Sequence, residues 1–329
     1  MNYEHFMKTS EKILNYIKDK KQATARELTD FLLISERAVF KQLGNLLVEN
    51  RVAKVGKPPK VFYIIKKDKE LLEEIIDINK KDKKIIDENY LAITASGLRR
   101  EGMEGFIYWC EKNKLPIKKT VAEYIKTLDK YGKYRKGGII DGINKFKNTF
   151  QEVGVVHAFY LDFYNIERFG RTKLGQLLLY SKQSQDRKLI KELVDKIHPT
   201  INKIINRYNI DAVGFIPPTV KREVQFMKEL RKNLNLSIKV INIVKIKTDI
   251  VVPQKTLNKL ADRIENARST IIVNETGKYN RILLIDDAIG SGATLNETAM
   301  QIKKKNIAKE VFGLSITGSF KGFDVISEV

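Results

Sequence analysis

The fold of this 329-residue chain is decided near its carboxyl end, by the stretch Arg281-Ile282-Leu283-Leu284-Ile285-Asp286-Asp287-Ala288-Ile289-Gly290-Ser291-Gly292-Ala293-Thr294. The four apolar residues 282–285 predict a buried strand that ends in two adjacent carboxylates. A glycine-rich turn follows and runs into the amino end of a helix that extends to about residue 305. A strand, a glycine-rich turn and a helix in this order favour an α/β fold with an anion at the helix terminus.

The turn has the chemistry of a phosphate site. Gly290 and Gly292 let the backbone approach an anion closely, and the first amides of the helix and its dipole favour negative charge. The hydroxyls of Ser291 and Thr294 add hydrogen-bond donors. The two aspartates cannot bind phosphate, but at the end of a strand they suit the hydroxyl groups of a sugar. The pattern therefore predicts a ligand with a 5-phosphate and free 2- and 3-hydroxyls.

This stretch resembles the phosphoribosyl pyrophosphate (PRPP) signature of type I phosphoribosyltransferases, four apolar residues and then Asp-Asp-x-x-[Ser/Thr/Gly]-[Ser/Thr]-Gly-x-Thr. The resemblance implies a parallel sheet flanked by helices over residues 155–329. It implies that Asp286 and Asp287 hold the ribose hydroxyls and stabilise the ribose cation. It assigns the 5-phosphate to Gly290, Ser291, Gly292, Ala293 and Thr294. Gly290 departs from the many members that have a hydroxyl residue there, and a strand and capped helix of another α/β domain is the alternative.

Two further segments are similar to the ComF-type subgroup of that family. Residues 212–219 predict a strand and turn, followed by Lys221 and Arg222 and a helix over 224–234. The resemblance implies that this basic pair binds pyrophosphate, with Mg²⁺ carried by PRPP and no metal held by the protein; a solvated helix start is the alternative.

Pro253-Gln254 and Arg263-Ile264-Glu265-Asn266 imply a mobile flap over 247–279, with Arg263 catalytic. Glu223-Val224-Gln225-Phe226 departs from the usual Arg-Gly-Phe-Asn run, and residues 307–319 predict the next strand.

The amino-terminal residues predict three helices and a hairpin. Residues 10–20 are amphipathic, Thr24 and Glu27 form a capping box for a second helix, and a third helix follows residues 33–35. Residues 51–55 and 61–65 predict two strands around a basic, proline-containing tip. This order resembles the winged helix-turn-helix family over residues 1–67. The resemblance implies contacts to DNA or RNA from a set of polar side chains, Arg37, Lys41, Gln42 and Asn45 at the bases and Lys57 and Lys60 at the backbone. A docking or dimerisation module is the alternative.

The middle residues, 68–154, predict a helical, basic connector. Residues 68–90 are typical of an exposed helix, which could also dimerise, and residues 99–130 predict helices interrupted at Pro116. Over residues 118–147, nine Lys/Arg stand against three acidic residues. They alternate with four aromatic residues, Tyr124, Tyr131, Tyr134 and Phe146. Stacking on single-stranded bases is one interpretation, and a solvated basic loop with its aromatic side chains turned inward is the other.

Composition limits the class of protein. Hydrophobic residues make up 43% and charged residues 31% of the chain, a balance typical of globular proteins. One cysteine and three histidines provide no disulfide, zinc cluster or Ser-His-Asp arrangement. No apolar run approaches the roughly 18 residues of a membrane span, and residues 1–10 lack a signal-peptide pattern. We therefore expect a soluble, cytoplasmic protein with no membrane partner.

The net charge of +21 indicates a polyanionic partner. It divides into +7 over residues 1–67, +3 over 68–155 and +11 over 156–329. Nucleic acid is the commonest partner of this kind, although a lysine-rich proteome could supply part of the excess.

Three functional hypotheses follow. The first is a nucleic-acid-binding phosphoribosyltransferase, or a relative that acts on PRPP or a nucleotide with Mg²⁺. Such a reaction needs no protein nucleophile. The second is a transcription regulator that senses PRPP without catalysis, similar in layout to the purine repressors. The third is an effector or accessory subunit of a reverse-transcriptase-associated antiphage system, because winged-helix and phosphoribosyltransferase fusions occur there. A homodimer and a protein partner in a defence complex stay open.

Overall fold

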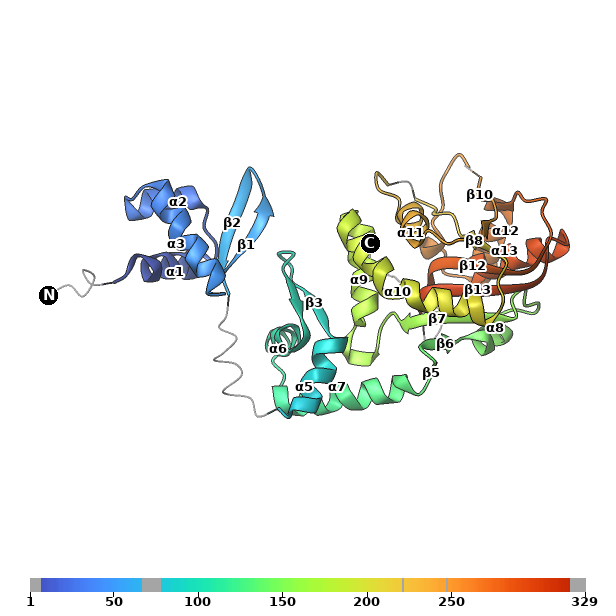
Figure 1. Cartoon of the computed structure of the whole chain (residues 1–329), viewed down its shortest axis with the longest axis horizontal. Helices are drawn as coiled ribbons and strands as arrows, with labels where there is room; N and C mark the ends of the chain where they lie inside the picture. The colour runs from blue at the N-terminus through green and yellow to red at the C-terminus, as the bar shows by residue number, and fades with distance from the viewer. Residues whose placement is uncertain (1–6, 67–77, 221, 247, 320–329) are drawn as a thin grey trace. The chain divides into compact units, whose positions relative to one another are not determined.

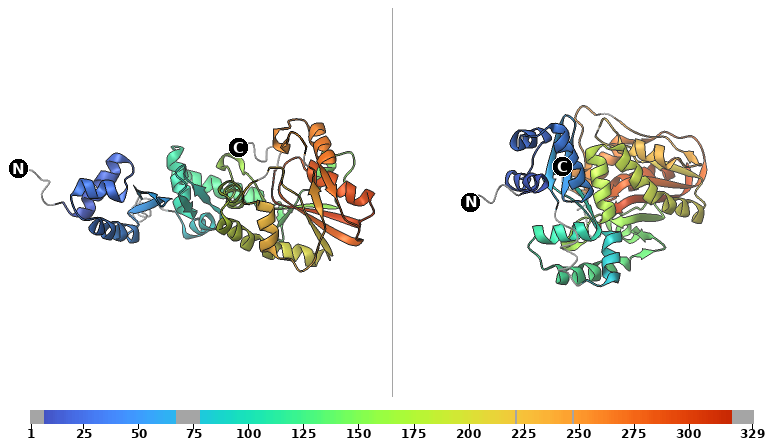
Figure 2. Two further views of the ribbon diagram at one scale, coloured as in Figure 1. Left: turned by 90° about the horizontal axis from the view of Figure 1, so that it is seen from above. Right: turned by 60° about the vertical axis from the view of Figure 1, so that its left-hand side comes forward.

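The computed structural model describes residues 7–66, 78–220, 222–246 and 248–319. The chain divides into two compact units, residues 1–122 and 123–329, and each is described by itself. Figures 1 and 2 show the helices and strands of both units.

Residues 9–65 form the predicted three helices and hairpin. α1 (Thr9–Lys20), α2 (Ala25–Leu32) and α3 (Glu36–Val48) precede the antiparallel strands β1 (Val52–Lys57) and β2 (Lys60–Ile65). The predicted capping box is present, because the Thr24 hydroxyl accepts from the amide of Glu27 while the Glu27 carboxylate accepts from the amide of Thr24. The helices and hairpin share one apolar core, which includes Ile13, Ile17, Leu28, Val39, Leu43, Leu46 and Tyr63.

A second group of elements in this unit covers residues 80–112. α5 (Lys80–Asn89) and α6 (Gly102–Lys112) enclose a short hairpin of β3 (Leu91–Ile93) and β4 (Arg99–Glu101). The sequence predicts α6 but not the hairpin, whose strands are too short to show an alternating pattern. Of the exposed helix expected over residues 68–90, residues 68–77 lie outside the described residues, and α5 confirms helix over 80–89.

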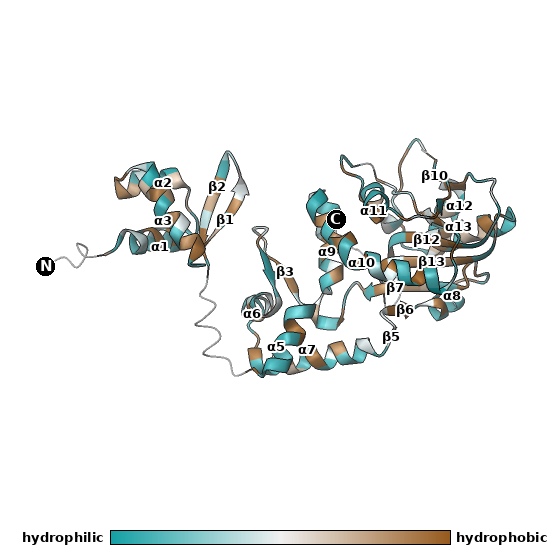
Figure 3. Cartoon of the chain, viewed as in Figure 1, coloured by the Kyte–Doolittle hydropathy of each residue, from teal (hydrophilic) through white to brown (hydrophobic). Residues whose placement is uncertain are grey.

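The second unit is α/β, with a seven-stranded sheet in the order β5-β6-β7-β13-β12-β8-β9. Its strands are β5 (Arg135–Lys136), β6 (Ile139–Asp141), β7 (His157–Phe163), β8 (Ala212–Phe215), β9 (Lys239–Val240), β12 (Tyr279–Ile289) and β13 (Ala308–Gly318). The five strands from β7 to β9 in the sheet are parallel, and β5 and β6 add antiparallel. Hydrophobic residues dominate β7, β12 and β13, as expected for strands buried on both faces (Figure 3).

Helices cover the sheet on both faces (Figures 1 and 2). They are α8 (Ile143–Thr149), α9 (Lys173–Ser184), α10 (Arg187–Arg207), α11 (Phe226–Leu234), α12 (Leu260–Thr270) and α13 (Ala293–Lys304). α7 (Ile117–Gly132) lies across the boundary between the two units. From β8 the chain continues through α11 to β9 at the sheet edge, whereas from β12 it continues through α13 to β13 in the opposite direction. The chain therefore turns in opposite directions after the neighbouring strands β8 and β12. Their carboxyl ends form a topological switch point, which is where open α/β sheets bind ligands.

Residues 135–149, which the sequence analysis places in the connector, contribute β5, β6 and α8 to this unit. The basic segment around them is not an array of exposed aromatic side chains. Tyr124 and Phe146 are buried, Tyr131 is half-buried, and Tyr134 alone of the four is exposed. The interpretation in which the aromatic side chains turn inward is thus correct for Tyr124 and Phe146 and in part for Tyr131. Their rings pack against other aromatic rings of the second unit.

Among the described residues, none of the helices combines the length and the apolar character that crossing a membrane requires.

Candidate functional site

A cavity of about 420 Å³ opens at the carboxyl ends of β8 and β12. This volume lies in the range of small-molecule sites, about 300–1,000 Å³. Its walls come from α9, the segment after β8, the start of α11, β10 (Ile243–Lys245), the 3₁₀ turn Gln254–Thr256 and its surroundings, and the stretch from β12 to α13. The polar residues that line it include Lys182, Arg222, Lys245, Asp286, Asp287, Ser291 and Thr294. The predicted carboxylates and glycine-rich turn therefore share one cavity.

The sequence predicts that this strand ends at the two aspartates, but β12 extends beyond them. It continues to Ile289, because β13 pairs with it up to Ile289 and Gly318. On the other side, pairing with β8 stops at Ile285 and Phe215. Asp286 and Asp287 are thus held by β13 on one side while the other side opens into the cavity. Successive side chains of a strand alternate between the two faces of the sheet, so the two carboxylates start from opposite faces.

The carboxylates lie in a dense set of charges. Lys182 Nζ donates to Asp287 Oδ2 at 2.5 Å, and the amide of Asp287 donates to Asp286 Oδ1 at 2.7 Å. Burial, followed by repulsion from the Asp287 carboxylate, raises the pKa of Asp286 to about 8. Lys182 and Lys245 act in the opposite direction but do not cancel these effects. The Asp286 carboxyl is therefore mostly protonated at neutral pH.

Two more cationic side chains complete the set. Lys245 Nζ donates to Thr219 Oγ1 at 2.8 Å, and burial lowers the pKa of Lys245 although Asp286 opposes this shift. Arg222 Nη1 donates to the backbone carbonyl of Lys182 at 2.6 Å. Of the predicted pyrophosphate pair, Arg222 lines the cavity, whereas Lys221 lies outside the described residues.

The turn after β12 is built around Gly292. This residue is the N-cap of α13 and has a φ of +85°, a conformation that glycine adopts at no steric cost. A Cβ there would lie 2.6 Å from the Phe146 ring, so the turn also needs glycine for space. Ser291 Oγ accepts from the amide of Ala293 at 3.3 Å. The first amides of a helix have no acceptor within it, and here the residues that carry them, 293–295, line the cavity.

α8 supports the turn from outside. Lys145 Nζ donates to the carbonyl of Gly290 at 2.6 Å and to that of Ser319 at 3.4 Å. The neighbouring Phe146 is fully buried and provides the ring against Gly292. A half-buried cation and an aromatic ring on one helix thus fix the backbone of the turn.

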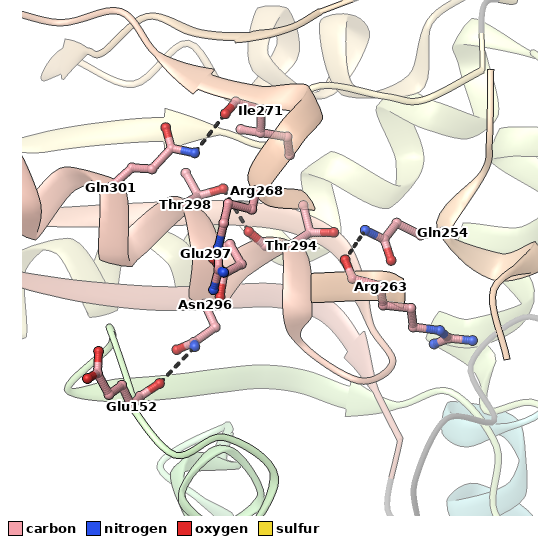
Figure 4. A network of polar contacts seen from close by, with 10 residues as sticks. All are labelled: Glu152, Gln254, Arg263, Arg268, Ile271, Thr294, Asn296, Glu297, Thr298 and Gln301. Carbon is pink, nitrogen blue, oxygen red and sulfur yellow. Dashed lines mark hydrogen bonds and ion pairs between the residues drawn. The ribbon is translucent and has the colours of Figure 1, made fainter. Parts of the chain in front are cut away.

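α13 is anchored along its length (Figure 4). The Asn296 side chain donates to the carbonyl of Glu152 at 3.0 Å and accepts from the amide of Gly154 at 2.8 Å. Arg268 of α12 donates to the Glu297 carboxylate at 2.9 Å, and Gln301 donates to the carbonyl of Ile271 at 2.7 Å. These contacts hold the amino end of the helix in a defined position at the cavity.

The stretch 247–279, expected as a flap, contributes Pro253, Gln254 and Arg263 to the cavity wall. It contains α12, which packs against α13, and β11 (Ile271–Val273), which pairs with β10; residue 247 lies outside the described residues. Arg263 lines the cavity, but its Nε donates to the carbonyl of Leu257 at 2.7 Å and its own carbonyl accepts from Gln254 at 2.8 Å (Figure 4). Burial lowers the pKa of Arg263. Through these two contacts Arg263 joins α12 to residues 254–257.

The predicted nucleic-acid contacts belong to the other compact unit. Arg37, Lys41 and Asn45 are exposed on α3, and Gln42 is half-buried. Lys60 is exposed at the start of β2, and its backbone pairs with that of Lys57 at the hairpin tip.

Sequence reasoning missed Lys182, Lys245 and Lys145. They precede Asp286 in the chain by between 41 and 141 positions, and nothing in their local sequence distinguishes them from the other lysines. Within the described part of the chain, no group of three or more His, Cys, Asp or Glu side chains could hold a metal ion. No protein-family model matches the sequence, and no curated protein matches it significantly.

Proposed function

We propose that the cavity binds PRPP or a related nucleotide and that the chain catalyses Mg²⁺-dependent phosphoribosyl transfer or related N-glycosidic chemistry. One observation carries the proposal: adjacent carboxylates and a glycine-rich helix start meet at the switch point of a parallel sheet, in one cavity with Lys182, Arg222 and Lys245. The resemblance to type I phosphoribosyltransferases implies the carboxylates, the turn and Arg222 of this arrangement, whereas Lys182 and Lys245 are additions from the structure.

In this proposal each part of the cavity binds one part of the ligand. The amides and hydroxyls of residues 290–294 bind the 5-phosphate, and Asp286 and Asp287 accept hydrogen bonds from the ribose hydroxyls. When the bond at C1 breaks, positive charge develops on the ribose ring, and the two carboxylates are placed to stabilise it. Lys182, Arg222 and Lys245 bind the departing pyrophosphate.

Mg²⁺ fits this site as an ion brought by the ligand. Mg²⁺ is commonly bound through one or two carboxylates together with substrate phosphates. The cavity offers one adjacent carboxylate pair, and the described residues form no larger metal cluster. Mg²⁺ supplies charge neutralisation on the pyrophosphate when bound.

Calorimetry with PRPP and MgCl₂ tests this proposal. We expect wild-type protein to bind and the double variant Asp286→Asn, Asp287→Asn to lose at least about tenfold in affinity, since each lost charge-assisted hydrogen bond costs about 1.5–3 kcal/mol. Asp30→Asn, an exposed carboxylate on α2, is the control and leaves binding unchanged. Absence of binding, or equal binding by the double variant, would contradict the proposal.

The second candidate is a non-catalytic regulator that senses PRPP. It is favoured by the exposed Arg37, Lys41 and Asn45 on α3, which suit a nucleic acid in a winged helix-turn-helix module. Pyrophosphate release on incubation of the protein with PRPP and nucleobases distinguishes the two: release indicates the enzyme, and binding without release indicates the sensor. The antiphage hypothesis gains no support from the four aromatic residues at 118–147, because only Tyr134 among them is exposed.

A further inference from the structure

The ion pair between Lys182 and Asp287 sets a condition on any ligand of the cavity. The nitrogen and oxygen are 2.5 Å apart, and the two side chains are 25% and 22% exposed. An Asp287 oxygen that accepts from Lys182 offers less capacity to a sugar hydroxyl. A sugar hydroxyl that donates to this oxygen therefore competes with the ammonium group for it.

Displacing Lys182 leaves a largely buried cation without its partner, which is costly unless another anion replaces the carboxylate. The neighbourhood of Lys182 shows where such an anion would lie. Its backbone carbonyl accepts from Arg222, and Gln185 at the end of α9 accepts from the amide of Val224 at 2.9 Å. The end of α9 is thus joined to the segment after β8, and Lys182 contacts Asp287 through its side chain and Arg222 through its backbone.

We propose that Lys182 is an exchangeable counter-ion that selects ligands with an anionic group at C1. It holds Asp287 in the ligand-free site and pairs with the C1 anion of a bound 5-phosphorylated pentose, while Asp287 turns to the ribose hydroxyls. This inference rests on the proposed function. It assigns specificity to α9, which precedes β8 in the chain and lies outside the signature-bearing stretch.

The inference distinguishes two ligands that share the 5-phosphate and the hydroxyls. PRPP carries pyrophosphate at C1, and this anion can replace Asp287 as the partner of Lys182. Ribose 5-phosphate has a neutral hydroxyl at C1, which cannot replace the carboxylate. Lys182 therefore favours the first ligand and opposes the second.

Calorimetry of Lys182→Met with both ligands, in MgCl₂, tests this. We expect PRPP affinity to fall by about tenfold or more, the loss of one charge-assisted hydrogen bond, while ribose 5-phosphate affinity stays equal or rises because Asp287 is released. Lys182→Arg keeps the charge and retains most of the PRPP affinity. Lys196→Met, an exposed lysine on α10, changes neither ligand.

Equal losses for both ligands in Lys182→Met, or no loss for PRPP, would overturn the inference. A Lys182→Arg variant that loses as much PRPP affinity as Lys182→Met would also overturn it, because charge would then not be the cause. Wild-type protein that binds neither ligand would instead contradict the proposed function itself. Circular dichroism melting of each variant shows that the comparison is made on folded protein.

Discussion

At Asp286, protein stability and ligand binding make opposite demands on one carboxyl group. The pKa is raised from 3.8 to about 8 by burial and by the Asp287 carboxylate. Between these two values the folded state keeps a proton that the unfolded chain has lost, so stability falls as pH rises through this window. A ribose hydroxyl, by contrast, donates more strongly to the ionised carboxylate.

Asp286→Asn removes this pH dependence. We expect the Tm of the variant, relative to wild type, to rise between about pH 5 and pH 9 by roughly 4 °C or more, since a pKa raised across this range corresponds to more than about 1 kcal/mol. Thermal melts at several pH values measure it. A difference in Tm that is the same at every pH would show that the carboxyl group is not held protonated in the folded protein.

Gly292 is the residue at which the backbone of the turn is most constrained. Its φ of +85° disfavours any side chain, and a Cβ would approach the Phe146 ring to 2.6 Å. We expect Gly292→Ala to destabilise the protein by about 1–3 kcal/mol, measured by urea unfolding.

Gly132→Ala is the matched control, because a Cβ at Gly132 meets nothing within 4 Å; its effect should stay within about 0.5 kcal/mol. Similar stabilities for both variants would mean that the turn is less constrained than its geometry indicates.

Among the elements, α8 has a role that its seven residues do not suggest. Because Lys145 fixes the carbonyl of Gly290, we expect Lys145→Met to weaken ribose 5-phosphate binding by about three- to tenfold, the net value of one hydrogen bond. Lys147→Met, an exposed lysine on the same helix, is the control. Calorimetry that gives equal affinities for the two variants would assign the turn's rigidity to α13 alone.

The strand, turn and helix around Asp286 could be predicted because their signals are local: an apolar run, two glycines and a helical pattern lie within 25 residues. The extension of β12 through both aspartates could not, because it is imposed by pairing with β13. Likewise the helix α12 within the stretch 247–279 was not predicted, and its packing on α13 is a tertiary contact. Local pattern therefore identified the elements, and tertiary contacts set their ends.

For the whole molecule, the positive charge predicts salt-dependent binding of nucleic acid. The net charge of +21 includes the exposed Lys41 and Lys60 of the first unit. We expect Lys41→Ala and Lys60→Ala in the full chain each to reduce the slope of log affinity against log salt by about 1, the release of one counter-ion. Fluorescence anisotropy with mixed-sequence duplex DNA and single-stranded RNA measures it.

Lys18→Ala, an exposed lysine on α1, should leave that slope unchanged. If all three variants behave as wild type, these helices and their hairpin instead form a docking module, which is the alternative that the sequence leaves open.

The lysines of the site could not be predicted from the sequence, because they come together only in the folded chain. Lys145, Lys182 and Lys245 reach the turn and the carboxylates from three different elements, α8, α9 and β10. These three elements are distant in the sequence, so their approach to the site depends on the tertiary fold and is not a property of any local segment. The aspartates and the glycine-rich turn could therefore be predicted from their motif. The lysines around them could be identified only from the folded structure.

A crystal structure of the protein with PRPP and Mg²⁺ shows which residues bind each part of the ligand. It should show the 5-phosphate on the amides of residues 291–294 and the ribose hydroxyls on Asp286 and Asp287, with Lys182 moved from Asp287 to the pyrophosphate. An empty cavity at saturating ligand, or a ligand bound with its phosphate away from Gly292, would contradict the account.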